Sequence, residues 1–242
     1  MAVRIGTSGW SYDHWADVLY RPGLPVARRL ARYVEVFDTV ELNASFYRWP
    51  RDATFASWRN RLPEGFTMAV KVHRGLSHFR RLSGPEEWID RIRRCWDALG
   101  DRHEAIMVQL HPQMSRDDGR LDAFLQQVPR DIRVALELRH PTWDAEPVYE
   151  LLAKHGAAYV VMSGAGLRRV LRATSDLVYV RLHGPGDGLY EGSYPDDELR
   201  WWADRIAAWQ EEDRRVVVYF NNDLGGHAVR NALRLRELVA PR

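Results

Sequence analysis

The chain has 242 residues, of which 45% are hydrophobic, 28% charged and 11% aromatic, and its formal net charge is +2. This composition excludes a disordered chain, because enough apolar surface is present to offset the entropy of ordering. The longest apolar runs are far shorter than about 18 residues, which excludes a membrane-spanning helix. The single cysteine, Cys95, excludes an internal disulfide and a cysteine-rich zinc site. The N-terminal residues lack the pattern of a secretory signal, so we expect a cytoplasmic protein.

Eight short apolar runs recur along the chain, most of them followed by a stretch with helical spacing. They cover residues 3–8, 38–43, 66–73, 105–110, 133–138, 157–162, 177–183 and 216–221. Continuous apolar runs are typical of parallel strands that helices cover on the outer face of a sheet. The pattern therefore predicts eight parallel strands.

Four of the intervening stretches have clear helical signals. They cover residues 25–37, 85–98, 196–212 and 226–238. In the first, Leu30, Tyr33, Val34 and Phe37 lie at the spacing of one helix face. The sixth connection, residues 163–176, is only weakly helical. Eight strand–helix units predict an α/β fold: a single (β/α)8 TIM-type barrel domain over residues 1–242, with an irregular sixth unit. A doubly wound open sheet is the alternative.

Polar side chains gather at the C-terminal ends of these strands, where a barrel of this type places its active site. They are Glu41 and Asn43, Lys71 and His73, Gln109, Glu137, Arg139 and His140, Arg181 and His183, and Asn221 and Asn222. Alternate strand residues point to the same face. We therefore expect Glu41, Lys71, Glu137 and Arg181 to converge at one rim of the barrel. The alternative is a set of ion pairs that fills the barrel and serves folding alone.

Glycine-rich loops follow the seventh and eighth strands. Residues 183–194 include Gly184 and Tyr190, and residues 221–228 include Gly225 and Gly226 before a helix. Loops at these two positions form the recurrent phosphate site of (β/α)8 barrels. Arg181 would add a fork of donors for the anion. A plain glycine-rich turn is the alternative reading.

Aromatic residues cluster after the first two strands, and Trp10 and Tyr47 are candidates for stacking on a flat base or sugar ring. Packing of these loops on the barrel is the alternative.

The segments IGTSGWSYDHW, ELNASFYRWP, ELRHPTW, RLHG and YFNN resemble, in this order, the YecE-like family, also called domain of unknown function 72. The resemblance covers nearly the whole chain and implies a TIM-type barrel with a polar cleft, but no established activity. It adds Trp143 to the candidate residues. Two positions differ from the family pattern: Ser77-His78 stands where a Thr-His pair is expected, and His111 replaces a proline.

These residues favour an enzyme that acts by acid–base chemistry on a small anionic ligand, phosphorylated or nucleotide-like. Glu41 and Glu137 are the predicted acid and base, and Lys71 stabilises negative charge. His140 and His183 are candidate proton carriers. The alternative is a non-catalytic module that binds a nucleotide or single-stranded nucleic acid, although the net charge gives it little support. No cofactor is predicted, and a divalent metal is a minor alternative. The pattern leaves the oligomeric state open.

Overall fold

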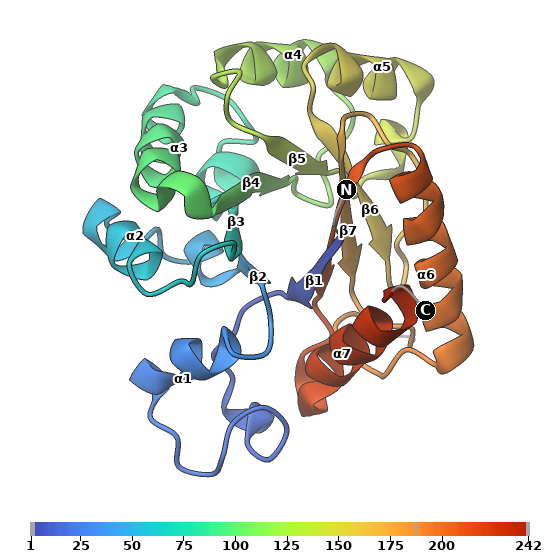
Figure 1. The fold of residues 1–242 in the computed structure, drawn as a ribbon. Coiled ribbons are helices and arrows are strands. Elements are labelled where there is room, and N and C mark those ends of the chain that lie inside the picture. Colours follow the sequence, from blue (N-terminus) through green and yellow to red (C-terminus); the bar gives the residue numbers. More distant parts are fainter. Residues whose placement is uncertain (1–2, 187, 241–242) are drawn as a thin grey trace. The chain divides into compact units, whose positions relative to one another are not determined.

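Strands and helices alternate along the chain in the computed structural model, which describes residues 3–186 and 188–240 (Figure 1). The strands are β1 (Val3–Thr7), β2 (Thr39–Leu42), β3 (Thr67–Lys71), β4 (His103–Gln109), β5 (Val134–Glu137), β6 (Ala158–Ser163), β7 (Leu177–Leu182) and β8 (Arg215–Phe220). The α-helices are α1 (Val26–Tyr33), α2 (Asp52–Arg59), α3 (Glu86–Leu99), α4 (Asp118–Gln127), α5 (Glu146–Lys154), α6 (Asp196–Glu211) and α7 (His227–Val239).

The strands are parallel and follow the order β1-β8-β7-β6-β5-β4-β3-β2. The first strand pairs with the last, so that Val3 lies opposite Val216 and Thr7 opposite Phe220. Beyond β1, Ser8 forms a further parallel bridge with Glu41 of β2. Consecutive strands are thus neighbours in the sheet, and the last strand is also a neighbour of the first. This is the topology of a (β/α)8 fold. The predicted fold class is therefore confirmed.

The predicted irregularity of the sixth unit is also confirmed, because no helix lies between β6 and β7 in residues 164–176, all of which the structure describes. Helix α1 is shorter than predicted. It ends at Tyr33, and the chain then turns so that the amide of Phe37 donates to Tyr33 O. Phe37 is still buried although it lies beyond the helix. The apolar spacing that extended the predicted helix to residue 37 therefore reports burial and not helical structure.

The described chain forms two compact units. Unit 1 comprises Met1–Glu41, Val161–Leu171 and Asp176–Arg242, and unit 2 comprises Leu42–Val160 and Arg172–Ser175. Within unit 1, helices α6 and α7 lie side by side, as do α2 and α3 within unit 2 (Figure 1). The prediction of one domain over residues 1–242 stays a prediction, and residues 1–2, 187 and 241–242 lie outside the described part. No helix in that part is long and apolar enough to cross a membrane.

Each unit buries polar side chains at the ends of otherwise apolar strands. In unit 1 they are Thr7, Ser8, Glu41, Arg181, His183, Asn221 and Asn222, and in unit 2 they are Ser45, Lys71, Ser77, Gln109 and Glu137. Burial of such groups costs free energy unless they are hydrogen-bonded or paired with opposite charge. Their partners therefore indicate what each cluster is built to do.

Candidate functional site

The unit 1 cluster is built around a fully buried ion pair between Glu41 and Arg181, whose side chains both have 0% exposure. Arg181 Nη2 donates to Glu41 Oε1 at 2.7 Å, and its Nε donates to Oε2 at 2.9 Å. Ser8 Oγ donates to Oε1 at 2.5 Å, and the Tyr179 hydroxyl donates to Oε2 at 2.6 Å. The carboxylate thus accepts hydrogen bonds from three side chains, and the arginine forks onto both of its oxygens.

This environment keeps Glu41 ionised. Burial on its own raises the pKa of Glu41, but the Arg181 charge and the hydrogen bonds from Arg181, Ser8 and Tyr179 bring the pKa below its ordinary value. A carboxylate with so many donors is a poor proton carrier near neutral pH. The acid–base role predicted for Glu41 stays a prediction, and the geometry favours Glu41 as the group that fixes Arg181.

His183 extends this cluster along β7. Its Nε2 lies 3.4 Å from Arg181 Nη1, and its Nδ1 lies 3.1 Å from Asn221 Nδ2. Arginine can only donate, so Nε2 accepts and Nδ1 carries the proton, which requires the Asn221 amide to present its oxygen to the ring. His183 is fully buried. The cluster is therefore a continuous chain of polar contacts from Ser8 to Asn221.

The two glycine-rich loops of unit 1 are held by their own hydrogen bonds. Gly184 has φ +104°, and a Cβ on it would lie 2.1 Å from Glu191 O, so only glycine fits there. Asn222 Nδ2 donates to Gly192 O at 2.8 Å and to Asn231 Oδ1 at 2.9 Å. The contacts give Asn222 a structural role that joins the two loops, whereas the anion site predicted there stays a prediction.

The remaining predicted residues of unit 1 lie around these loops. Tyr190 is 38% exposed, and its ring packs edge-on against His183 with 5.6 Å between centroids. Gly225 and Gly226 both have positive φ and form the turn before α7, where a Cβ on Gly226 would lie 2.8 Å from Val18. The carbonyl of Trp10 accepts a hydrogen bond from the Tyr20 hydroxyl.

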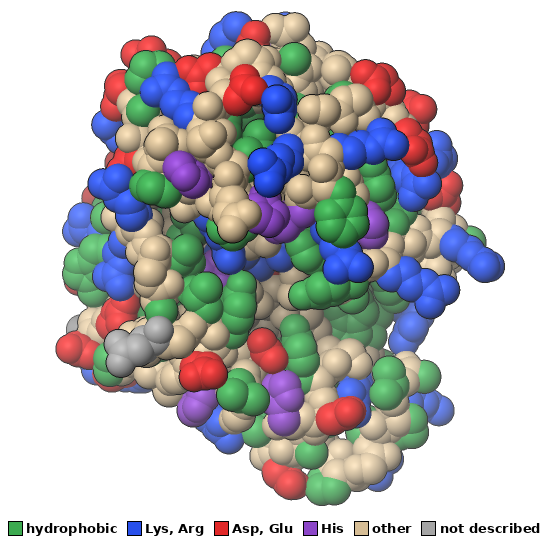
Figure 2. Space-filling view, turned by 180° about the vertical axis from the view of Figure 1, so that it is seen from behind, with side chains coloured by type: hydrophobic (Ala, Val, Ile, Leu, Met, Phe, Trp, Pro, Cys, Tyr) green, Lys and Arg blue, Asp and Glu red, His purple; other side chains and the backbone are tan. Residues whose placement is uncertain are grey.

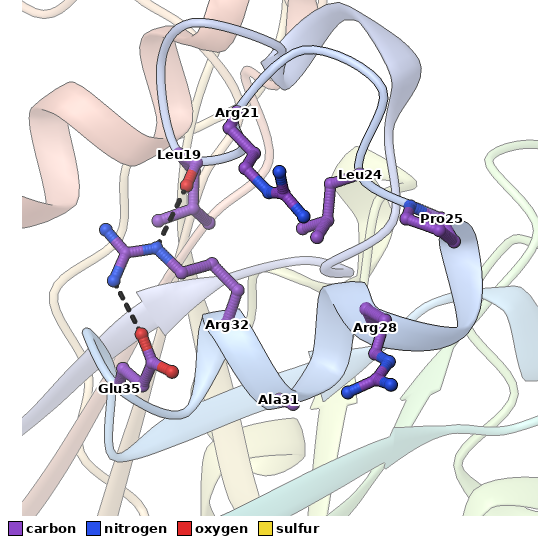
Figure 3. Close-up of a pocket in the computed structure, with 8 residues that line it drawn as sticks. All are labelled: Leu19, Arg21, Leu24, Pro25, Arg28, Ala31, Arg32 and Glu35. Carbon is purple, nitrogen blue, oxygen red and sulfur yellow. Dashed lines mark hydrogen bonds and ion pairs between the residues drawn. The ribbon is translucent and has the colours of Figure 1, made fainter.

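Unit 1 also has a cavity that no sequence pattern predicted. Its volume is about 750 Å³, within the range of small-molecule pockets, and it lies between the loop after β1 and helix α1 (Figure 3). The residues that line it are Leu19, Arg21, Leu24, Pro25, Arg28, Ala31, Arg32 and Glu35. Arg32 donates to Glu35 at 2.6 Å and to Leu19 O at 3.3 Å (Figure 3). None of the predicted site residues lies in this lining.

The unit 2 cluster contains a second buried carboxylate, Glu137, at the end of β5. Arg139 Nε donates to its Oε1 at 2.6 Å, and Gln109 Nε2, at the end of β4, donates to the same oxygen at 2.5 Å. Glu137 is 0% exposed, and the side chain of Arg139 is 9% exposed. Gln109 lies directly opposite Glu137 in the sheet register. Gln109 and Glu137 thus lie next to each other at the ends of two neighbouring strands.

Lys71 supplies another cation at the end of β3. It is 6% exposed, and its Nζ lies 4.3 Å from the centre of the Phe46 ring. Such a contact stabilises an ammonium group that burial strips of water. Ser45 Oγ donates to Lys71 O at 2.6 Å, which ties the short helix that carries Phe46 (Ala44–Phe46) to the end of β3.

His78 joins this cluster, although it was not among the predicted site residues. It lies on a single π-helical turn, η3 (Gly75–Phe79), a feature that is frequent at functional sites. Its Nδ1 is 3.0 Å from Ser77 Oγ, and its ring packs edge-on against Phe46 at 4.8 Å and His111 at 5.1 Å. The one signal in the sequence was the Ser77-His78 pair, noted above as a variation of the family pattern.

His78 is neutral over most of the pH range. Burial lowers its pKa to about 4, with further lowering by His111, Lys71 and Arg139, while Glu137 opposes the shift. Of these groups, His111 contacts the His78 ring directly, and Lys71 lies over Phe46, which contacts the same ring. A half-buried imidazole with this pKa is neutral and only weakly basic near neutral pH, and a negative charge bound next to it would raise its pKa.

Other predicted residues of unit 2 make structural contacts. His73 Nδ1 accepts from the Gly75 amide, its Nε2 donates to Tyr47 O at 3.2 Å, and the ring stacks on Trp88. Burial lowers the pKa of His73, which fits this neutral tautomer. His140 Nδ1 accepts from the amide of Thr142 at the start of a short helix.

Trp143 and Asn43 complete the predicted set. Trp143 is 1% exposed, and its indole N–H donates to Met114 O at 2.8 Å, so its ring belongs to the core of unit 2. Asn43 is half-buried, and its Oδ1 has no hydrogen-bond partner among the described residues. Figure 2 shows histidine side chains lying among Lys, Arg and hydrophobic side chains on one face of the molecule.

The predicted residues are divided between the two units. Unit 1 contains Trp10, Glu41, Arg181, His183, Gly184, Tyr190, Asn221, Asn222, Gly225 and Gly226, and unit 2 contains Asn43, Tyr47, Lys71, His73, Gln109, Glu137, Arg139, His140 and Trp143. The convergence of both sets at one rim stays a prediction. Among the residues that the structure describes, no three His, Cys, Asp or Glu side chains group as a metal ion requires.

A model of the family described as "Protein of unknown function DUF72" matches residues 4–242 of the chain. The chain belongs to this family. The resemblance seen in the sequence motifs is thereby confirmed, since the YecE protein of Escherichia coli K12 is among the similar proteins. It is 24% identical over 182 residues, which cover 75% of this chain and 62% of YecE. The YunF protein of Bacillus subtilis is 28% identical over an alignment of 281 positions. The alignment covers 98% of this chain and 94% of YunF.

Solved structures of other DUF72 proteins agree with the fold. A DUF72 family protein from Thermotoga maritima has 27% identity and a TM-score of 0.89, with all of both chains covered. One from Enterococcus faecalis has 21% identity and a TM-score of 0.85, with 100% and 96% covered, which shows the fold alone. Membership of DUF72 thus supports the architecture and assigns no reaction.

Proposed function

We propose that this DUF72 protein is an enzyme that acts by acid–base chemistry on a small phosphorylated ligand, and that the unit 2 cluster carries the reaction. The observation that carries the proposal is the setting of His78, a half-buried imidazole that lies 3.0 Å from the Ser77 hydroxyl and packs on the same Phe46 ring as the Lys71 ammonium. The cluster contains the basic side chains of Lys71 and Arg139 and one carboxylate, so it attracts an anion. Perturbed ionisable groups of this kind mark functional sites more often than chance.

His78 can accept a proton from the bound ligand once the negative charge of the phosphate has raised the pKa of the imidazole. When Nδ1–H donates to Ser77 Oγ, Nε2 presents its lone pair as the base. The Ser77 hydroxyl can accept that hydrogen bond before and after proton transfer, because it has two lone pairs. Ser77 is fully buried and so fixes the plane of the imidazole.

The other groups of the cluster hold charge. Lys71, fixed over Phe46, and Arg139, fixed by Glu137, are placed to bind the phosphate and to stabilise negative charge that develops on the ligand. Gln109 donates a hydrogen bond to the same Glu137 oxygen that accepts from Arg139, and so restrains the carboxylate further. Glu137 acts here chiefly as the group that orients Arg139, and it remains the second candidate for proton transfer.

The proposal is tested first by a screen for ligands that bind and then by an assay of their conversion to product. Sugar phosphates, glycerol phosphates and nucleoside monophosphates are screened for a rise in melting temperature, because a ligand that binds only the folded state stabilises it by mass action. Compounds that bind are then followed for product formation by phosphorus and proton NMR. We expect His78→Gln to lower turnover by about 10²- to 10⁴-fold, the usual contribution of a general base, while the affinity changes little.

A matched control is His155→Gln, which removes a histidine paired with Asp122 elsewhere in unit 2. It should leave both affinity and turnover unchanged. Lys71→Met should weaken binding. The proposal is wrong if none of these phosphorylated compounds raises the melting temperature, or if His78→Gln turns over as fast as the unmodified protein.

A further inference from the structure

Two pairs of neighbouring residues place aromatic rings at the outer side of the unit 2 cluster. In the pairs Phe46-Tyr47 and His78-Phe79, the inner rings, Phe46 and His78, contact each other with 4.8 Å between centroids. Phe46 is also the ring beneath the Lys71 ammonium. The outer rings belong to the most exposed large hydrophobic side chains of the described chain: Tyr47 is 64% exposed and Phe79 is 71% exposed.

Arg74 connects the two outer rings. Its guanidinium carbon lies 5.8 Å from the centre of the Tyr47 ring and 5.4 Å from that of Phe79. No carboxylate is paired with Arg74 among the residues that the structure describes. We call Tyr47, Arg74 and Phe79 the aromatic platform. It combines two ring faces with a flat cation, and both kinds of group stack on planar π-systems.

The backbone segments that carry the platform are held together by His73. His73 donates to Tyr47 O and accepts from the Gly75 amide, so one imidazole joins the two segments that carry the rings. A Cβ on Gly75 would lie 2.7 Å from Trp88 and 2.8 Å from His73 Nδ1, which means that glycine allows this close packing. Because this backbone is already ordered, a ligand that stacks on the rings has to order only their side chains.

We propose that the ligand of the unit 2 cluster carries a planar aromatic ring beside its phosphate, as nucleoside monophosphates and aryl phosphates do. This inference rests on the proposed function and names its substrate class. The phosphate lies with Lys71, Arg139 and His78, and the ring stacks on the aromatic platform. Tyr47 contacts Phe46 at 5.1 Å, and Phe46 contacts Lys71, so one side chain separates the platform from the cationic group.

The experiment measures dissociation constants for ligands that differ only in the ring. AMP is compared with ribose 5-phosphate, and phenyl phosphate with inorganic phosphate, by isothermal titration calorimetry. We expect each ring to tighten binding by about tenfold or more, since stacking of one base on aromatic side chains commonly has an effect of this size. The double variant Tyr47→Leu/Phe79→Leu, which keeps apolar bulk without flat rings, should bind AMP no more tightly than ribose 5-phosphate.

The control variant is Trp201→Leu, because Trp201 also packs against guanidinium groups, those of Arg169 and Arg205, but lies on α6 in unit 1. It should leave the preference for ring-bearing ligands unchanged. If AMP and ribose 5-phosphate bind the unmodified protein equally, or if the preference survives in the double variant, the inference is overturned while the proposed function stands. If no phosphate compound binds at all, both are overturned.

Discussion

The buried pair of Glu41 and Arg181 gives a sharp prediction for stability. Glu41→Gln keeps the shape of the side chain but removes its charge and turns one acceptor oxygen into a donor that faces Arg181, Ser8 or Tyr179. Loss of one partner of a buried ion pair costs about 3–5 kcal/mol, because the other charge stays buried without compensation. For a chain of this size, 1 kcal/mol corresponds to about 2–4 °C in melting temperature. The variant should therefore melt about 6–20 °C below the unmodified protein.

Circular dichroism melts at neutral pH measure this shift. The matched control is Asp131→Asn, which removes the carboxylate of an exposed ion pair with Arg93, at 2.7 Å, and should change the melting temperature little. The double variant Glu41→Leu/Arg181→Met replaces both charges by apolar groups and should recover part of the loss, because the hydroxyls of Ser8 and Tyr179 still lose their acceptor. The reasoning is refuted if Glu41→Gln melts within a few degrees of the Asp131→Asn control.

Two further predictions concern single residues. Because the pKa of His78 is about 4 in the fold and about 6.5 when unfolded, the unfolded chain binds more protons between these values, and stability should fall as the pH is lowered from about 6.5 to 4. Urea midpoints at several pH values test this, and His78→Gln should flatten the curve. Gly184→Ala should lower stability by about 1–3 kcal/mol through strain, whereas Gly186→Ala, whose Cβ would have only Glu191 O at 4.0 Å, should be tolerated. Equal urea midpoints for the two glycine variants would contradict the reading of that loop.

The fold could be predicted because buried parallel strands leave a direct mark on the sequence. Apolar runs between helical stretches placed each strand to within about two residues of its observed bounds. The pairing of Glu41 with Arg181 was not predicted, because the pattern assigned Glu41 to proton transfer and Arg181 to anion binding; only the general alternative of ion pairs inside the barrel is consistent with it. Helix α1 shows the limit, because periodic burial continued to Phe37 after the helix had ended.

The chemistry of the sites was less accessible from the sequence. The number of hydrogen-bond donors around a buried carboxylate cannot be read from the sequence. The hydrogen bonds from Ser8 and Tyr179 to Glu41 could therefore not be predicted. His78 lies on a π-helical turn, whose spacing leaves no periodic signal. His73 had the residue type of a ligand, yet its two nitrogens bind backbone groups, and only coordinates distinguish those outcomes.

The connection between β6 and β7 has a consequence for how members of this family can diverge. A covering helix must match the length of the strands beneath it, so residues can seldom be added to it without loss of packing. Here the chain is pinned at two points instead. Arg169 bonds Glu198 at 2.6 Å and lies over Trp201 and Trp202, while the Thr174 hydroxyl binds both Tyr159 N and Ala157 O. Residues inserted between such anchors should disturb the strands less than residues inserted in a packed helix, so this connection is a place where new specificity can be acquired at small cost to folding.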